Sequence, residues 1–439
     1  MTSLSRIFYL LIGIVLLASC SSTRKANRTI SHTLKDSLFF KQGFAGLALY
    51  DPIANEMLYT HNADKYFTPA SNTKLFTFYT GLTVLGDSVP ALKYYTSGDS
   101  LVFKGTGDPS FLNPDLPESK VLKFLKDRKE QLFYLPPTYQ EAYFGPGWSW
   151  DDFNSYYSVE RSAFPIYGNR VTFTQKEHFT LPQAYPVYFQ QMLLPDSLNL
   201  KDSRRIKREM ASNNFAYGLI ERDSGYSQDV PIKYSPELFV TLLKDTLKKD
   251  VQIINTLPES FINERTLYSI PTDSIYKRML KVSDNFIAEQ ILLMASEEIA
   301  DTLKTDIAIE FMKDNFLNDL PDQPQWVDGS GLSRYNLFTP RTLVKLLEKI
   351  KDKMPQDKLF GLMAVGGKSG TLENYYSAEE PYIFAKTGSL SNNHSLSGFI
   401  KTRSGRVLIF SFMNSNYTIP TRELKKGMER ILLTIRDNY

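Results

Sequence analysis

The stretch PASNTKLFTFYTGLTVLG, residues 69–86, is the most informative part of this chain of 439 residues. Its long apolar run ends at Gly86-Asp87, which predicts a buried helix that begins near Ser71. Ser71 and Lys74 are three positions apart and therefore share one face of that helix. A serine hydroxyl is a poor nucleophile unless a base lies beside it, and a desolvated lysine amine can be that base. The stretch thus predicts a nucleophilic Ser71 activated by Lys74.

A second short motif, Ser283-Asp284-Asn285, interrupts a helical pattern that covers residues 275–299. A serine at this point can relay a proton. The amide of Asn285 can hold both a substrate carbonyl and the amine of Lys74. We therefore expect Ser283 and Asn285 to lie beside Ser71 and to take part in catalysis.

A third motif, Lys386-Thr387-Gly388, comes at the end of a strand-like segment. Lys386 and Thr387 can bind a substrate carboxylate, and Gly388 leaves space for a peptide along the strand edge. The N–H of Ser389 can then share a developing oxyanion with the N–H of Ser71. This motif predicts the substrate-binding side of the site.

Each motif alone is weak, because a capped helix or a turn explains it equally well. Ser274 and Lys277 have the spacing of the first motif, and Lys368-Ser369-Gly370 resembles the third. The order of the three motifs is more specific, since it is the signature of penicillin-binding proteins and class A β-lactamases.

The two ends of the chain are expected to form one domain. Residues 44–50 and 56–59 predict a β-hairpin, and strand-like segments follow at residues 382–413 before a helical pattern at residues 422–435. Pairing of these remote strands would give one antiparallel sheet. Residues 44–86 and 269–439 are therefore assigned to this domain, and residues 87–268, with their short strand patterns, to an inserted β-rich region.

The composition excludes several classes of function. With 51 Lys+Arg against 48 Asp+Glu the net charge is +3, so no strongly basic surface indicates nucleic acid as a partner. One cysteine and four histidines, none at metal-ligand spacing, argue against a metal site. No dinucleotide or P-loop motif is present. We expect no cofactor and no metal.

The N-terminus predicts export. Residues 7–17 are an unbroken apolar run, and Leu17-Ala18-Ser19 precedes Cys20, as in a bacterial lipobox. We expect residues 1–19 to be a signal peptide, Cys20 to carry a lipid, and residues 20–43 to be a polar tether. The protein would then be a membrane-anchored lipoprotein of the periplasm or cell envelope. The alternative is a plain secretory signal with an incidental cysteine.

With these motifs the chain resembles the D-alanyl-D-alanine carboxypeptidase/endopeptidase family of low-molecular-mass, class C penicillin-binding proteins. Ser71 and Ser283 are 212 positions apart, which matches the family's large insertion. Further similar stretches are Gly105-Thr106-Gly107-Asp108-Pro109, Gly147 to Asp152, Asp328-Gly329-Ser330-Gly331-Leu332-Ser333-Arg334 and Gly370-Thr371-Leu372. The fold that the resemblance implies is an α/β (α+β) domain like those of β-lactamases and transpeptidases. It has an antiparallel sheet with helices on both faces and carries the β-rich inserted domain.

The resemblance implies acyl transfer on the stem peptides of peptidoglycan. Ser71 would attack the penultimate D-alanine carbonyl, and water would resolve the acyl-enzyme, with β-lactam antibiotics as covalent inhibitors. Asp151 or Asp152 can bind the diamino-acid side chain of the substrate, although a structural role is the simpler interpretation. Asp328 and Arg334 are expected to form an ordering ion pair or turn. Whether two copies form a homodimer stays open.

Three alternatives share the same scaffold. A β-lactamase would need a dedicated deacylating base and would release penicillin within seconds. An esterase or D-amino-acid amidase would act on simple esters and not on muropeptides. A catalytically idle peptidoglycan-binding lipoprotein would have no need of the intact serine, lysine and asparagine groups.

Overall fold

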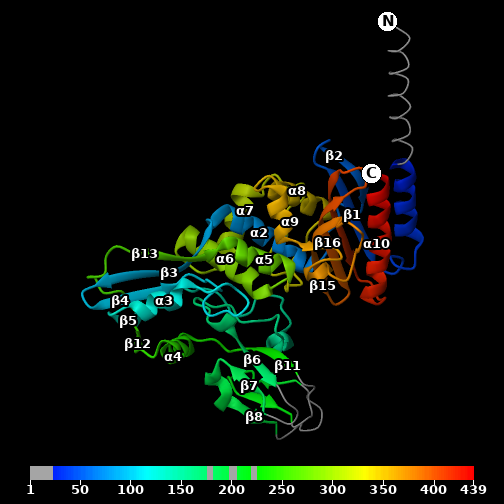
Figure 1. Cartoon of the computed structure of the whole chain (residues 1–439). Coiled ribbons are helices and arrows are strands. Elements are labelled where there is room, and N and C mark those ends of the chain that lie inside the picture. The colour runs from blue at the N-terminus through cyan, green and yellow to red at the C-terminus, as the bar shows by residue number, and fades with distance from the viewer. Residues whose placement is uncertain (1–22, 176–180, 197–204, 219–224) are drawn as a thin grey trace, which may run out of the picture.

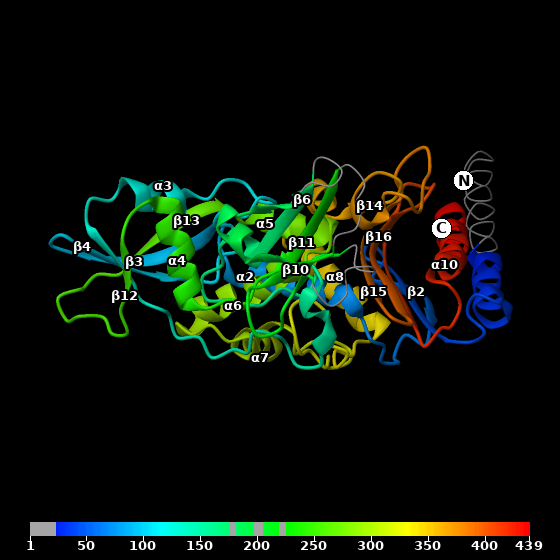
Figure 2. The same cartoon turned by 90° about the horizontal axis from the view of Figure 1, so that it is seen from below.

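The computed structural model describes residues 23–175, 181–196, 205–218 and 225–439. The predicted signal peptide and Cys20 lie outside these residues. Figure 1 shows an elongated molecule with a sheet and its flanking helices at one end, a group of helices in the middle, and β-rich parts beyond them. Figure 2 shows the same elongation from below. Within the described ranges, no helix is both long enough and apolar enough to cross a lipid bilayer.

A six-stranded sheet joins the two ends of the chain in the strand order β14-β15-β16-β17-β1-β2. β1 pairs antiparallel with β17, so that Phe44 lies opposite Ser415 and Tyr50 opposite Ile409. The expected pairing of remote strands is thus confirmed. The bounds are β1 (Phe44–Asp51), β2 (Glu56–His61), β14 (Ala364–Val365), β15 (Ile383–Leu390), β16 (Asn393–Lys401) and β17 (Val407–Ser415).

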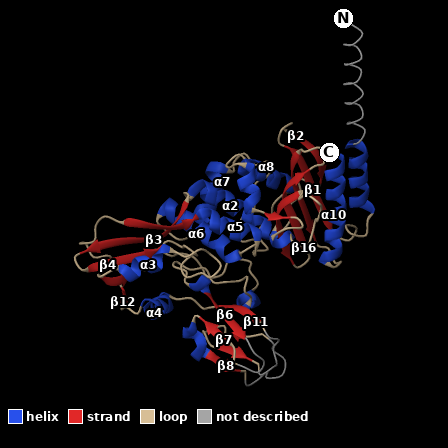
Figure 3. Cartoon of the chain, in the orientation of Figure 1, coloured by secondary structure: helices blue, strands red, loops and turns tan. Residues whose placement is uncertain are grey.

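Helices cover both faces of this sheet. After Phe44 every residue of β1 is buried, which requires apolar cover on each side of the strand. α8 packs against β1 and β17 on one face, and α10 packs against β16 on the other. Figure 3 shows the strands of this sheet between the two groups of helices. The predicted mixed fold, an antiparallel sheet with helices on both faces, is confirmed.

The N-terminal segment differs from the expected tether. Residues 23–36 are helical, and their apolar side chains share a buried core with α10, the C-terminal helix. Ala26, Ile30 and Leu34 recur every four residues, so they form one apolar stripe on the helix. The segment looked polar because its other face is solvent-exposed and basic. The prediction of a free tether over residues 20–43 is therefore wrong for this helix.

The middle of the molecule is a helical layer that holds the first two motifs. In α2, the residues from Lys74 to Gly81 are all buried. α6 packs directly against α2, and it is buried over most of its length. The helices are α2 (Lys74–Val84), α5 (Thr272–Lys281), α6 (Asn285–Ala300), α7 (Thr305–Phe316), α8 (Pro340–Lys351), α9 (Gln356–Leu362) and α10 (Thr421–Asn438). Tight packing of α2 and α6 fixes the positions of the groups they carry.

The insertion has an apolar core of its own, rich in aromatic side chains such as Phe103, Phe164 and Phe239. Its first and last long strands, β3 and β13, pair antiparallel and bring the two ends of the insertion together. This separate core supports the division that we propose, with residues 87–268 as an inserted domain. Its strands and helices are β3 (Ser88–Ser97), β4 (Ser100–Gly105), α3 (Lys120–Asp127), β5 (Gln131–Tyr134), β6 (Arg170–Gln175), β7 (Gln183–Tyr185), β8 (Leu193–Pro195), β9 (Lys207–Arg208), β10 (Phe215–Tyr217), β11 (Tyr226–Pro231), α4 (Pro236–Leu247), β12 (Val251–Ile253) and β13 (Arg265–Pro271).

Short 3₁₀ helices lie at several of the connections. They are η1 (Ala70–Thr73), η2 (Trp150–Asn154), η3 (Tyr167–Asn169), η4 (Val187–Met192) and η5 (Gly370–Leu372). Four of them, η1, η2, η3 and η5, border the site described below.

Candidate active site

Ser71 lies in η1, the 3₁₀ turn that leads directly into α2. Thr73 Oγ1 donates a hydrogen bond of 2.9 Å to Ala70 O and closes the turn. Asn72 Nδ2 donates to Lys386 O over 3.0 Å, which ties the turn to β15. Ser71 is partly exposed, whereas Asn72 and Thr73 are fully buried. The turn therefore presents the Ser71 side chain from a fixed backbone.

Lys74 is buried one turn further on, and its ammonium group has three acceptors. Lys74 Nζ donates to Ser71 Oγ over 2.9 Å, to Asn285 Oδ1 over 2.6 Å and to Ser330 O over 2.6 Å. Burial lowers the pKa of Lys74 to about 8, although nearby carboxylates oppose the shift. A substantial fraction of the amine is therefore neutral near physiological pH.

The three acceptors also determine where the lone pair of the neutral amine points. Asn285 Oδ1 and the carbonyl of Ser330 can only accept hydrogen bonds. They occupy the two N–H groups that remain on the neutral amine of Lys74. The lone pair is left to accept the proton of Ser71 Oγ, which is the geometry of a general base.

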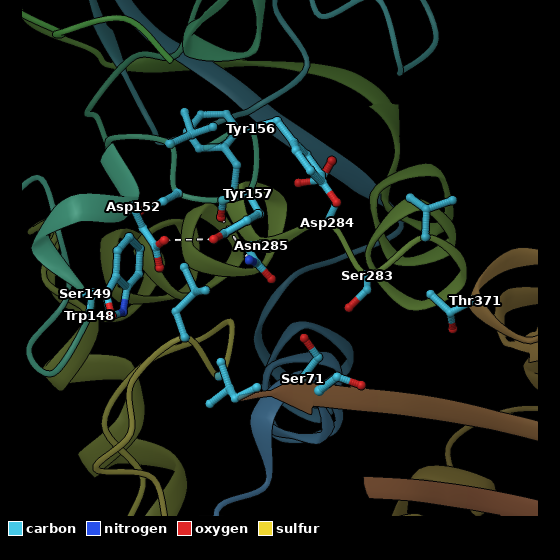
Figure 4. Close-up of a pocket in the computed structure, with 18 of the residues that line it drawn as sticks. Ser71, Trp148, Ser149, Asp152, Tyr156, Tyr157, Ser283, Asp284, Asn285 and Thr371 are labelled. Atoms are coloured by element: carbon cyan, nitrogen blue, oxygen red, sulfur yellow. Dashed lines mark hydrogen bonds between the residues drawn. The ribbon is translucent and has the colours of Figure 1, made fainter. Parts of the chain in front are cut away.

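Ser283 lies between α5 and α6 with a positive φ of 67°. Asp284 caps α6 by accepting a hydrogen bond of 3.1 Å from the N–H of Ile287. Asn285, the first residue of α6, donates through Nδ2 to Tyr157 O over 2.9 Å. The predicted helix interruption thus turns Ser283 and Asn285 toward Ser71, as Figure 4 shows.

Lys386 reaches the same place from β15. Its Nζ donates to Ser283 Oγ over 2.8 Å and to Thr387 O over 2.8 Å. Burial and the neighbouring Lys74 ammonium hold the pKa of Lys386 well below its usual range. The third motif lies inside β15, not at the end of a strand as the sequence suggested, because the strand continues to Leu390.

Gly388 allows β15 to pass directly against the Ser71 turn. A Cβ at this position would lie 2.4 Å from Pro69 O and 2.8 Å from Ser71 N. The adjacent Thr387 Oγ1 donates to Thr371 Oγ1 over 2.7 Å. Ser389 Oγ is 2.7 Å from His394 Nδ1 on β16. The structure therefore brings all the predicted residues of the three motifs to one place.

One edge of β15 beside these residues has no strand partner among the described residues. β14 pairs with β15 only at Ala385 and Phe384. On its other side β15 is paired with β16 along its whole length. From Thr387 to Leu390 the free edge can therefore receive an extended peptide.

The cavity above Ser71 has a volume of about 860 Å³. The third motif contributes Thr387 and Ser389 to its wall. The insertion contributes aromatic and acidic side chains to the cavity wall: Trp148, Asp151, Asp152, Tyr156 and Tyr157. Figure 4 shows Tyr157 beside Asn285, with Asp152 next to it. Asp152 accepts a hydrogen bond of 2.8 Å from Tyr157 Oη. Both carboxylates that the sequence left between a structural and a binding role thus line the cavity.

The loop at residues 328–331 completes the site, and its contribution was not predicted. Asp328 is fully buried and accepts from the N–H groups of Gly331 and Ser333, at 2.8 and 2.7 Å, and from Trp148 Nε1 at 2.9 Å. The expected turn is present, but the alternative ion pair with Arg334 is absent from the described residues. Arg334 is exposed at the cavity wall. The sequence marked this stretch as specific, yet the carbonyl of Ser330 is a backbone group that no side-chain pattern reveals.

Among the residues that the structure describes, no group of three His, Cys, Asp or Glu side chains is placed to hold a metal ion.

Comparison with known proteins identifies similar chains. A model of the D-Ala-D-Ala carboxypeptidase 3 (S13) family matches residues 26–435. The D-alanyl-D-alanine carboxypeptidase DacB of Haemophilus influenzae is 22% identical, with 88% of each chain covered. The crystal structure of penicillin binding protein 4 from the same organism has a TM-score of 0.74 at 18% identity and covers 93% of this chain and 99% of its own. The Bdellovibrio bacteriovorus peptidoglycan endopeptidase Bd3459 has a TM-score of 0.50 at 17% identity, with 90% and 92% covered.

Proposed function

Because the chain belongs to the D-Ala-D-Ala carboxypeptidase 3 (S13) family, we propose that Ser71 forms the acyl-enzyme with peptidoglycan stem peptides and that Lys74 is its base. Membership confirms the predicted class of enzyme, a serine-type carboxypeptidase. The observation that carries the assignment of residues is the 2.9 Å hydrogen bond from Nζ of the fully buried Lys74 to Ser71 Oγ at the cavity.

Acylation follows from this geometry. Neutral Lys74 takes the proton of Ser71 Oγ while Oγ bonds to the carbonyl carbon of the penultimate D-alanine. The N–H groups of Ser71 and Ser389 hold the oxyanion that develops. The C–N bond then breaks, and Ser283 relays the proton from the lysine to the amine that leaves. Ser283 lies in the cavity wall with Ser71, and because its Oγ accepts from Lys386 Nζ over 2.8 Å, its own O–H is left to donate to the leaving amine.

Deacylation uses the same groups in reverse. A water molecule attacks the ester carbon and gives its proton to Lys74. The C–Oγ bond breaks, and Lys74 returns the proton to Ser71 Oγ. The shortened peptide leaves with a new carboxylate, whereas the amine product left earlier, during acylation: terminal D-alanine in carboxypeptidase action, or the amine side of a cross-link in endopeptidase action.

The substrate lies along the free edge of β15 in this proposal. Its terminal carboxylate is bound by the hydroxyl of Thr387, with Lys386 Nζ behind it, and Gly388 lets β15 lie against the turn that carries Ser71. The acidic pair Asp151 and Asp152 in the cavity wall attracts the amino group of the stem-peptide side chain. The insertion thus supplies a side of the substrate site.

A covalent β-lactam adduct tests the function. After incubation with penicillin, the intact protein is expected to gain the mass of one whole antibiotic, and digestion is expected to locate it on the peptide that contains Ser71. Protein from the same preparation that has not been treated with penicillin should release D-alanine from a D-Ala-D-Ala peptide. The reason is that both reagents present a carbonyl carbon to the same nucleophile.

Two results would contradict the proposal. The first is an adduct on any other residue, and the second is normal peptide turnover by the Ser71→Ala variant. Release of the penicilloyl group within seconds would instead favour a β-lactamase. Digestion of intact sacculi, followed by mass spectrometry of the products, separates D-alanine trimming from cleavage of cross-links.

We also propose that the enzyme is a periplasmic lipoprotein anchored through Cys20. The apolar run at residues 7–17 and the Leu17-Ala18-Ser19-Cys20 sequence support this location. Wild-type protein is expected in the membrane fraction with a lipid mass on Cys20. The Cys20→Ala variant is expected to lose that lipid, and an unmodified wild-type Cys20 would exclude the anchor.

A further inference from the structure

Behind Lys74 lies a buried carboxylate that the proposed mechanism does not use. Glu289 follows Asn285 by one turn on α6 and is fully buried. Its Oε1 accepts a hydrogen bond of 2.7 Å from the N–H of Ser330. Its Oε2 is 3.4 Å from Nη1 of Arg161, a fully buried guanidinium that the insertion supplies.

We propose that Glu289 is a positioning residue for Lys74, which it holds through Ser330 and whose proton affinity it raises with its charge. This inference rests on the proposed function, because it concerns the base of that reaction. Through Arg161 it also connects the inserted domain to the catalytic lysine.

The effect of Glu289 on the position of Lys74 depends on Ser330, which contacts both residues. The N–H of Ser330 is held by Glu289, and the carbonyl of Ser330 accepts from Lys74 Nζ over 2.6 Å. The loop packs closely between α6 and the Ser71 turn, so a shift at Glu289 is passed on to its neighbours. A Cβ on Gly329 would lie 2.6 Å from Ala288 O, and a Cβ on Gly331 would lie 1.9 Å from Ala70 O. A displaced Glu289 would therefore move the carbonyl that orients the lone pair of Lys74.

The effect of Glu289 on the protonation of Lys74 depends on the burial of its carboxylate. Burial, with the nearby charge of Asp328, raises the pKa of Glu289 to about 7. Above that pH the carboxylate is charged, and it is one of the anions that oppose the lowered pKa of Lys74. The titratable and charged groups facing Lys74 or Glu289 from the elements packed around them are Asp284, Asp328, Lys386, Arg161 and, paired with Arg161, Glu141.

The sign of the effect follows. Removing an anion near Lys74 makes its protonated form less favourable, so the pKa of Lys74 falls further. Acylation requires the neutral amine, so the rate should rise at a lower pH. The Glu289→Gln variant keeps the side-chain oxygen for Ser330 but removes the charge, and it isolates this effect.

The test is the rate of acylation by a fluorescent penicillin measured between pH 5 and pH 10. For Glu289→Gln, the rise of the rate with pH is expected to move to lower pH by roughly one unit. For Glu289→Asp, the charge remains but the shorter side chain no longer reaches Ser330. That variant is expected to keep the wild-type midpoint and to have a lower plateau rate.

Glu297 is a matched control on the same helix. It is also buried, its pKa is also raised to about 7 by burial, and its partner Lys93 lies at 2.5 Å, away from the site. Glu297→Gln is expected to leave the pH midpoint unchanged. An equal shift in both variants would mean a general loss of helix packing and would overturn the proposal.

Other outcomes also overturn it. An unmoved midpoint in Glu289→Gln excludes the electrostatic role, and an undiminished plateau in Glu289→Asp excludes the mechanical one. If the Glu289→Gln variant does not fold, the dependence of the acylation rate on pH in Glu289→Asp tests the proposal alone. In that case a shifted pH midpoint together with an undiminished plateau rate contradicts the proposal. Wild-type protein that is not acylated on Ser71 at any pH would instead refute the proposed function itself.

Discussion

A Lys74→Met variant is expected to be acylated by penicillin roughly 10²- to 10⁴-fold more slowly than the wild type, the range that a positioned general base contributes. Methionine has a similar length and fills the buried space, so the loss reports the missing amine. Without it, Ser71 Oγ has no acceptor for its proton. The acceptors Asn285 Oδ1 and Ser330 O would also be left without their buried donor. The measurement is the rate constant of labelling by a fluorescent penicillin.

Another pair with the spacing of the first motif, at residues 274–277, supplies the control for this experiment. Ser274 and Lys277 have the same spacing as Ser71 and Lys74, but Lys277 is exposed on α5. Lys277→Met should be labelled at the wild-type rate. Near-normal labelling of Lys74→Met would refute the assignment of Lys74 as the base.

A Gly331→Ala variant is expected to lower the free energy of unfolding by roughly 3 kcal/mol or more, from backbone strain together with overpacking. Gly331 has a φ of 81°, and its new Cβ would lie 1.9 Å from Ala70 O. The clash is with backbone, so no side chain can rotate away from it. The clash would push the Ser71 turn away from the loop that carries the Ser330 carbonyl, so penicillin labelling should fall as well. Urea unfolding followed by tryptophan fluorescence measures the loss of stability.

A Gly405→Ala variant measures the effect of backbone strain without the steric clash. Its φ of 87° is close to that of Gly331, but nothing lies within 4 Å of its Cβ position. Gly405→Ala is expected to show only the strain, about 1 kcal/mol, with normal labelling. Equal losses of stability in the two variants would contradict the close approach of the loop to the Ser71 turn.

The sequence predicted those parts of the site that are side chains in recognisable patterns. Ser71 and Lys74 could be placed on one helix face because the helical period is fixed. Ser283 could be placed at a break between helices, and β1 could be expected to pair with the C-terminal strands. These predictions depend on local periodicity, which the chain follows closely.

Other parts could not be predicted, because they depend on tertiary contacts. The carbonyl of Ser330 belongs to the backbone, so no pattern of side chains in the sequence indicates it. The role that we propose for Glu289 depends on its contacts with Ser330 and Arg161, which lie far from it in the sequence. Residues 23–36 carry enough charge to resemble a tether, while a sparse stripe of Ala26, Ile30 and Leu34 is sufficient to bind a helix to α10. The strand-like pattern stops before the third motif, yet β15 continues through that motif to Leu390 and needs Gly388 where it passes Ser71.

The order of strands in the main sheet has a consequence for biosynthesis. β1 is among the first parts of the chain to be made, but its neighbour β17 is among the last. Until both ends of the chain fold together, the β1–β2 hairpin has an open edge, and the turn that carries Ser71 lacks its hydrogen bond from Asn72 to Lys386 O. The residues of the three motifs therefore come together only after β15, β16 and β17 have joined the sheet.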